Sequence, residues 1–349
     1  MKPYIEINGM RIGIGYPTYI IAEMSANHNQ NFKQAVKIIE AAKEAGANAI
    51  KLQTYTSDTM TIDCDNEYFK IKGTIWEGNN LYKLYEEAYT TWEWQPRLEK
   101  IAEKLGLDLF STPFDSTAVD FLESMDVPAY KIASFEIVDI PLLRKIAETG
   151  KPIIISTGMA SLAEIDEAVH TVRHAGAKQI ALLKCTSAYP GPPEEANLRT
   201  IPHLAQAFGV PVGLSDHTMG TAVAVASVAL GASIVEKHFT LSRKDPGPDS
   251  SFSMEPKEFK AMVDDIRNVE KALGKVSYEI TEKQKASRVF RRSLFVVKDI
   301  AQGEVFTVEN IRSIRPGYGL HTRYLKTVLG RSAKKDIEKG TPLGWDLIC

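Results

Sequence analysis

Short apolar runs alternate with helical patterns through most of the chain, and this alternation constrains the fold more than any other feature. The runs have the length of buried strands, whereas the segments between them carry apolar residues at helical spacing and end at a glycine. Eight such strands predict a (β/α)8 TIM barrel; a doubly wound open sheet is the alternative, although no G-x-G-x-x-G follows the first strand. The predicted strands cover residues 19–23, 49–53, 107–111, 129–133, 152–156, 180–184, 210–214 and 233–236, and the predicted helices cover 32–45, 94–105, 142–149, 162–175, 198–208, 219–230 and 255–273.

The two ends of the chain depart from this alternation. Residues 4–16 alternate around Asn8-Gly9, which is a strong signal for a type I′ β-hairpin. We therefore predict a catalytic barrel domain of residues 1–277 that includes this hairpin. Residues 278–292 are charged and lack a helix or strand period, so they are predicted to be a linker.

Residues 293–349 are predicted to form a separate, small β-rich module. The segment V-K-D-I-A-Q-G-E-V-F at 297–306 returns as K-K-D-I-E-K-G-T-P-L at 334–343, and this repeat predicts internal pseudo-symmetry. Between the two copies, Arg315 is followed by a proline and two glycines. Such a rigid loop is a candidate for a contact with a ligand, with a solvated turn as the simpler alternative.

Composition narrows the function classes. The chain has 349 residues, of which 44% are hydrophobic and 25% charged, and a formal net charge of −2, so no global charge favours nucleic acid or a membrane surface. Cys64, Cys185 and Cys349 lack zinc or redox spacing, which favours free thiols in a reducing compartment. The first residues contain no signal-peptide core and no run is long enough to span a membrane, so we expect a cytoplasmic protein.

Polar side chains follow the predicted strands at their carboxyl ends, which form the active face of a TIM barrel. His217 and His238 leave neighbouring parallel strands at the same edge, beside carboxylates, and are candidate ligands of a divalent metal. Lys51 and Lys131 interrupt apolar strands at positions that point into the barrel, and a buried lysine requires an anion. The alternative, that all strands end in polar loops, accounts for the serines and threonines but poorly for the two lysines.

One connection, residues 56–91, is long for a compact domain, and loops of this length are usually functional. Asn79 and Asn80, with a tryptophan and two tyrosines nearby, suit a carbohydrate, whose hydroxyls need hydrogen bonds and whose apolar face stacks on rings. A surface helical hairpin is the alternative.

Ten short segments follow one another along the chain and form a recognisable set. They are A-E-M-S-A-N-H, I-K-L-Q, F-S-T-P-F, Y-K-I-A-S-F-E, I-S-T-G-M, K-C-T-S-A-Y-P, G-L-S-D-H-T, E-K-H-F-T, G-P-D-S-S-F-S and R-P-G-Y-G-L. Taken together, these segments resemble the sialic acid synthase family, the bacterial synthases of nonulosonic acids. The resemblance runs end to end, and it implies a TIM barrel followed by an antifreeze-like (SAF) domain, assembled as a domain-swapped homodimer. Within the family, S-A-N-H, K-C-T-S and G-P-D-S make the chain most similar to the pseudaminic acid synthase subgroup.

The resemblance also implies an activity: phosphoenolpyruvate condenses with an open-chain 2,4-diacetamido-2,4,6-trideoxyhexose of the L-altrose type and water, giving pseudaminic acid and phosphate. It implies that His217 and His238 hold Mn²⁺ or Mg²⁺ and that Glu23 and Glu136 handle protons. The residues implied for phosphoenolpyruvate are Lys51, Thr112, Lys131, Ser134, Ser156, Ser187 (where several relatives have Asn) and Ser215, and those implied for the sugar are Glu23, Gln53, Asn79, Tyr189, Asp249 and Arg315, the last from the partner subunit.

Other functions stay open from the sequence. N-acetylneuraminate or legionaminic acid is the alternative product within the family. A lyase that acts on pyruvate through a Schiff-base lysine is the rival enzyme, and a non-catalytic carbohydrate-binding or ice-binding protein is the rival class.

Overall fold

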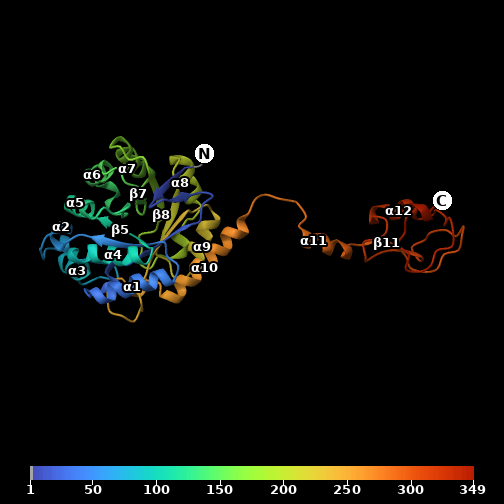
Figure 1. The fold of residues 1–349 in the computed structure, drawn as a ribbon, viewed down its shortest axis with the longest axis horizontal. Coiled ribbons are helices and arrows are strands. Elements are labelled where there is room, and N and C mark those ends of the chain that lie inside the picture. Colours follow the sequence, from blue (N-terminus) through green and yellow to red (C-terminus); the bar gives the residue numbers. More distant parts are fainter. Residues whose placement is uncertain (1–2) are drawn as a thin grey trace. The chain divides into compact units, whose positions relative to one another are not determined.

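The structure, a computed structural model, describes residues 3–349 and divides into two compact units, Met1–Gly274 and Lys275–Cys349. In the first unit, parallel strands close into a barrel in the order β10-β3-β4-β5-β6-β7-β8-β9 (Figure 1). The predicted TIM barrel is thereby confirmed. Its strands are β3 Tyr19–Glu23, β4 Ala49–Thr54, β5 Asp108–Pro113, β6 Tyr130–Ile132, β7 Ile153–Ser156, β8 Ile180–Cys185, β9 Val212–Asp216 and β10 Ile234–His238.

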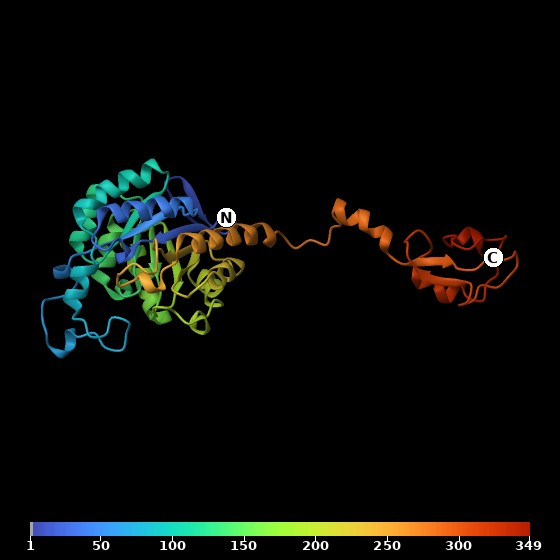
Figure 2. The same cartoon turned by 90° about the horizontal axis from the view of Figure 1, so that it is seen from below.

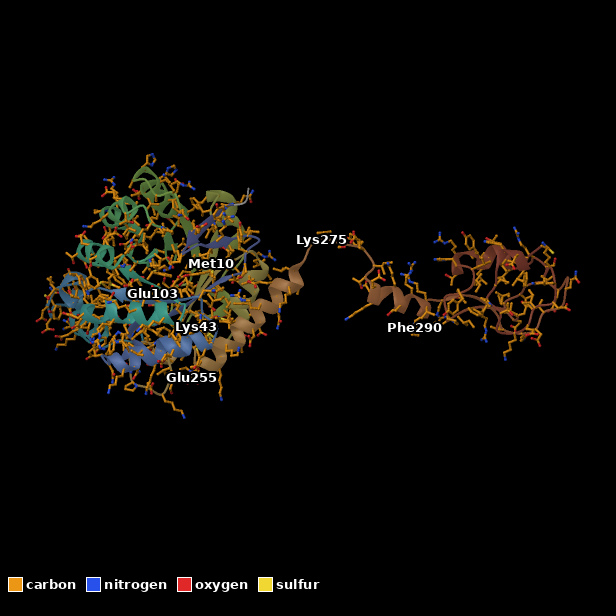
Figure 3. All side chains as sticks on the ribbon, viewed as in Figure 1. Met10, Lys43, Glu103, Glu255, Lys275 and Phe290 are labelled. Carbon is orange, nitrogen blue, oxygen red and sulfur yellow. The ribbon has the colours of Figure 1, made fainter. Side chains whose placement is uncertain are left out.

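Helices surround this barrel, and most of them carry one apolar stripe that packs on the outer face of the strands. Neighbouring helices also contact each other: Lys43 of α1 donates to the carbonyl of Gly106, just after α4, at 3.0 Å (Figure 3). The helices are α1 Phe32–Glu44, α2 Ser57–Met60, α3 Leu81–Ala88, α4 Gln95–Lys104, α5 Ser116–Met125, α6 Ile140–Glu148, α7 Leu162–His174, α8 Thr200–Phe208, α9 Ala222–Ala229 and α10 Pro256–Leu273.

Helix α5 was not among the predicted helices. Those helices were each recognised by a glycine at the end, whereas α5 ends at Asp126, which adopts the left-handed conformation with φ of 57°. Aspartate is one of the few residues other than glycine that tolerates this conformation. At the other end, the side chain of Asp115 accepts hydrogen bonds from the backbone amides of Thr117 and Ala118 and caps the helix.

The N-terminal hairpin is present as predicted, with β1 Tyr4–Ile7 antiparallel to β2 Met10–Gly13. Asn8 and Gly9 both have positive φ, 44° and 79°, as a type I′ turn requires. The Asn8 amide donates to Asp108, the first residue of β5, at 2.7 Å, and the isoleucines of the hairpin join the barrel core. The hairpin therefore covers the amino ends of the strands and leaves the carboxyl ends for other uses.

The second unit contains a short antiparallel sheet of β11 Ser293–Val296 and β12 Ile311–Ile314, a short helix α12 Leu325–Val328, and its own apolar core. The predicted repeat is visible in its hydrogen bonds. The backbones of Ile300 and Ile337 exchange two bonds of 2.9 and 2.8 Å. The side chain of Asp299 accepts from the amide of Lys339, and that of Asp336 accepts from the amide of Gln302, each at 2.7 Å. Equivalent positions of the two copies thus bind each other reciprocally, as pseudo-symmetry demands. Helix α11 Glu282–Ser287 lies within the segment predicted as a linker.

The long connection after β4 contains α2 and α3, and the chain between them extends beyond the barrel helices (light blue in Figure 2). Asn80, at its end, is buried: its side chain accepts from the amide of Tyr82 and so caps α3, and it donates to the carbonyl of Cys64 at 2.7 Å. Among residues 3–349, no helix has the length and apolarity needed to cross a membrane.

Candidate active site

Four charged side chains meet inside the barrel at the carboxyl ends of its strands. The Lys51 ammonium lies 2.8 Å from Glu23 and 3.7 Å from Glu236, and the Lys131 ammonium lies 3.5 Å from Glu236. The sheet register explains the first pair, because Glu23 and Lys51 are direct partners on β3 and β4. All four residues are at most 5% exposed, so their charges interact with little screening by water. We call this cluster the floor of the site.

Burial and charge act against each other on the floor. Burial raises the pKa of Glu23 to about 7, although the Lys51 ammonium opposes the rise. Burial also acts to raise the pKa of Glu236, but the ammonium groups of Lys131 and Lys51 outweigh it and lower that pKa. Burial acts to lower the pKa of Lys51, but the two carboxylates outweigh it and raise that pKa, whereas for Lys131 burial prevails and its pKa is lowered. Glu23 is therefore the carboxyl of the floor that exchanges a proton near neutral pH.

Hydroxyl groups surround the two lysines. Lys51 donates to the hydroxyl of Thr112 at 3.2 Å, Lys131 donates to that of Ser156 at 2.7 Å, and Ser215 donates to Glu236 at 3.3 Å. Two ammonium groups and several hydroxyls in a water-poor site form a strong receptor for a small molecule with two anionic groups.

Ser134 and Ser187 are brought together by a glycine that the sequence did not single out. The Gly158 amide donates to the Ser134 hydroxyl at 3.0 Å, and a Cβ added at Gly158 would collide with the hydroxyl oxygens of both serines. Glycine at this position therefore permits a close approach of two hydroxyls.

His217 and His238 lie beside the floor with ring centroids 5.3 Å apart. Nδ1 of His217 bonds to the carbonyl of Thr186 at 2.9 Å, which leaves Nε2 with a free lone pair, and Nδ1 of His238 is buried with no partner among the described residues. A buried imidazole nitrogen without a partner, next to a second available nitrogen, fits a divalent metal ion. Within residues 3–349 no group of three or more His, Cys, Asp or Glu side chains that could hold a metal ion is present, so the two histidines are the ligands that the described residues offer here.

A buried ion pair holds the strand ends that carry the histidines. Lys237 donates to Asp216 and to the carbonyl of Thr218, both at 2.6 Å, and Asp216 also accepts from the amide of Thr218 at 2.9 Å. Asp216 and Lys237 are register partners on β9 and β10 and each precedes a histidine, so their side chains leave the strands on the face opposite to the site. The pair therefore ties the two histidine-bearing segments together from behind.

A cavity of about 650 Å³ opens above the floor. Its polar lining includes Gln53, which donates to Glu23 at 3.0 Å, and Asp249, which accepts from the hydroxyl of Ser25. Glu136 also lines it, and burial raises the pKa of Glu136 to about 7. The ring of Tyr189 lies 4.4 Å from that of His217 and closes one side.

The structure gathers most of the residues implied by the resemblance. The floor and its surroundings hold Glu23, Lys51, Thr112, Lys131, Ser134, Ser156, Ser187, Ser215 and His217, and the cavity lining holds Gln53, Glu136, Tyr189, His238 and Asp249.

Two implied residues are not among these. Asn79 is exposed and does not line the cavity, because the residue whose side chain turns inward there is its neighbour Asn80, used for capping α3. Arg315 belongs to the second unit.

Two residues that were not among the predicted site residues belong to the site, although Glu236 is one of the carboxylates expected beside the histidines. Glu236 lies two residues before His238 on β10, and the strand period of two, which points both side chains the same way, was the signal that could have found it. Cys185 lies with its sulfur 3.9 Å from Nδ1 of His217. Burial acts to raise the pKa of this thiol, but the hydrogen bond and charge of His217, together with Ser134 and Lys131, outweigh it, and the pKa falls to about 6.

The sequence pattern of the NeuB family matches residues 38–278, and that of the SAF domain matches residues 291–348. The chain is 47% identical to the pseudaminic acid synthase of Helicobacter pylori over 331 residues, which cover 95% of this chain and 97% of that relative. It is 46% identical to a pseudaminic acid synthase of Campylobacter jejuni over 325 residues, or 93% and 95% of the two chains. The crystal structure of the spore coat polysaccharide biosynthesis protein spsE from Bacillus subtilis is similar, with a TM-score of 0.68 and 35% identity over 99% of each chain.

Proposed function

Because this chain belongs to the NeuB family, we propose that it condenses phosphoenolpyruvate with an open-chain 2,4-diacetamido-2,4,6-trideoxyhexose and water, giving pseudaminic acid and phosphate. The sugar is of the L-altrose type. The observation that carries the proposal is the convergence of two buried lysines with hydroxyls beneath a cavity that is lined by His238, whose neighbour is His217.

Phosphoenolpyruvate fits the floor because it carries a phosphate and a carboxylate on a three-carbon frame. Lys51 and Lys131 each neutralise one anionic group, and the hydroxyls donate to the remaining oxygens. The residues that hold it are Lys51, Thr112, Lys131, Ser134, Ser156, Ser187 and Ser215. This assignment is supported by the burial of most of these residues and by the hydroxyls that Lys51 and Lys131 contact in addition to the carboxylates of Glu23 and Glu236.

The reaction forms a bond between the methylene carbon of phosphoenolpyruvate and the aldehyde carbon of the sugar, whose oxygen gains a proton. Water adds to the cation left at the enol carbon and loses one proton. The carbon–oxygen bond to phosphate then breaks, and the new hydroxyl gives up its proton to the departing phosphate to leave a ketone. Glu23 and Glu136 both have a pKa of about 7 and can therefore either give or accept a proton at neutral pH. His217 and His238 would hold Mn²⁺ or Mg²⁺, which when bound supplies Lewis acidity for the aldehyde oxygen.

Phosphate release tests the proposal directly. Phosphate should appear only when both substrates are present, and the product should have the mass and the NMR spectrum of pseudaminic acid. Phosphoenolpyruvate labelled with heavy oxygen at its bridging position should place the label in phosphate, because the carbon–oxygen bond breaks. Failure to release phosphate with any sugar from a panel of N-acetylated aldehydes, or trapping of pyruvate on a lysine by borohydride, would refute it.

We also propose that the protein works in the cytoplasm as a domain-swapped homodimer, in which the partner subunit's Arg315 contacts the sugar. The support is the family resemblance of R-P-G-Y-G-L, and for the cytoplasm the multiple negative charges of phosphoenolpyruvate, which prevent it from crossing a bilayer unaided. Inactive His217→Ala and Arg315→Ala chains, mixed through unfolding and refolding, should regain activity if each site is completed in trans. No recovery in demonstrated mixed dimers would contradict the exchange.

A further inference from the structure

The lining of the cavity above the floor becomes less polar with distance from the charged residues. Its charged lining residues and His238 lie at the strand ends or in the loops beyond them, whereas the long connection after β4 contributes a wall of mainly apolar residues, together with Thr59 and Thr74. Helix α3 supplies four residues of the lining. Leu81, Leu84, Tyr85 and Ala88 all line the cavity, and they occupy positions i, i+3, i+4 and i+7 of α3, which lie on one helical face.

This placement of α3 is unusual for a helix outside a barrel. An amphipathic helix normally buries its apolar face against a core, yet Leu81, Leu84 and Tyr85 remain only half-buried because they face the cavity. An apolar face kept at the rim of a polar site indicates that a ligand completes its burial.

The wall is also anchored, so that its shape is defined before a ligand arrives. The ring of Tyr55 is buried and lies in edge contact with Tyr85 at 5.7 Å and with Phe114 at 5.2 Å. On the far side of the connection, the indole of Trp76 donates to the carbonyl of Pro248 at 2.9 Å. A preformed wall discriminates better than one that must be ordered on binding.

The chemistry of the reaction orients the sugar in this cavity. The aldehyde carbon must lie at the floor, where it meets phosphoenolpyruvate beside His217 and His238. The other end of the open chain, with C6, therefore extends away from the charged residues. A hydroxyl that meets the leucine side chains of α3 finds no hydrogen-bond partner on them, whereas a methyl group gains apolar contact.

We propose that the apolar face of α3, centred on Leu84, is a methyl-binding subsite that receives the deoxygenated C6 and an acetamido methyl of the sugar. It thereby selects a 6-deoxy diacetamido sugar over its 6-hydroxy analogue. This inference rests on the proposed function and adds the residues that determine its specificity.

The test compares kcat/KM for the 6-deoxy sugar and its 6-hydroxy analogue, measured by phosphate release. An apolar pocket rejects an added hydroxyl by about 100-fold at most, so the wild-type preference should be between about 10-fold and 100-fold. Leu84→Asn should lower this preference about tenfold, since the amide gives the hydroxyl a partner and removes contact with the methyl, while the KM for phosphoenolpyruvate stays unchanged. Leu84→Met should keep the preference.

Ile75→Asn is the matched control, because Ile75 lies on the same connection but is exposed and does not line the cavity. It should leave the preference unchanged. The subsite is refuted if the wild type turns over both sugars equally, or if Leu84→Asn, shown to be folded by circular dichroism, keeps the wild-type preference. If the wild type turns over neither sugar, the proposed function fails, and the subsite fails with it.

Discussion

Replacement of Lys237 by methionine should cost the barrel far more stability than the same replacement at Lys145. Both lysines belong to ion pairs of nearly equal length, since Lys237 lies 2.6 Å from Asp216 and Lys145 lies 2.7 Å from Asp120. They differ in burial. The side chains of the first pair are 2% and 1% exposed, whereas those of the second are 34% and 68% exposed.

The expected magnitudes follow from this difference. Lys237→Met leaves the Asp216 carboxylate buried without its cation, which costs about 3 to 5 kcal/mol in comparable buried pairs. Lys145→Met removes an exposed pair that contributes about 0 to 1 kcal/mol. For a unit of this size, the buried replacement should lower Tm by roughly 6 to 20 °C and the exposed one by no more than about 4 °C.

Equilibrium unfolding in guanidinium chloride, followed by far-ultraviolet circular dichroism, measures both free energies. The double replacement Asp216→Asn with Lys237→Met is the diagnostic variant, because it removes the uncompensated charge but keeps an oxygen that can accept from the Thr218 amide. It should be more stable than Lys237→Met alone, because the effects of the two replacements on stability are coupled rather than additive. Equal losses at Lys237 and Lys145, or a double variant less stable than Lys237→Met, would refute the reasoning.

Three further predictions address the site. Lys51→Ala should reduce kcat/KM for phosphoenolpyruvate by at least about 30-fold, which corresponds to about 2 kcal/mol or more for a buried charged contact. Lys43→Ala should leave kcat/KM nearly unchanged. Similar losses in both variants would show that the anion site does not lie at Lys51. His217→Ala and His238→Ala should each weaken Mn²⁺ binding, measured by electron paramagnetic resonance. A chelator should abolish the activity of the wild type until Mn²⁺ is added back. Full activity in excess chelator would exclude a role for the metal. Burial raises the pKa of Glu136 from 4.5 to about 7, so between these pH values the folded state holds a proton that the unfolded state releases. The contribution of Glu136 to the free energy of unfolding should therefore fall by up to about 3 kcal/mol as the pH rises from 4.5 to 7. Glu136→Gln should reduce that fall in urea titrations at the two pH values, and an unchanged fall would contradict the assignment.

The barrel and its active face were predictable because they depend on local periodicity. The lengths of the strands and helices, and the glycines at the ends of most helices, are properties of short segments and can be read without knowing the tertiary structure. The inward direction of Lys51 and Lys131 follows from the strand period of two, and the hairpin follows from the turn chemistry of Asn8-Gly9. Helix α5 was missed for the same local reason, since Asp126 replaces the expected glycine.

The residues that meet inside the barrel were decided by the tertiary structure. Nothing local to Glu236 or Gly158 indicates that one contacts two lysines from other strands or that the other lets two serines approach each other. In the connection after β4 the sequence predicts even less, because an irregular segment has no repeating period that would indicate whether Asn79 or Asn80 turns inward. The sequence determined the periodic elements and the face on which chemistry occurs. The barrel's closure decided which side chains share that face at contact distance, because distances between strands are set by packing along the whole chain rather than by neighbours in sequence.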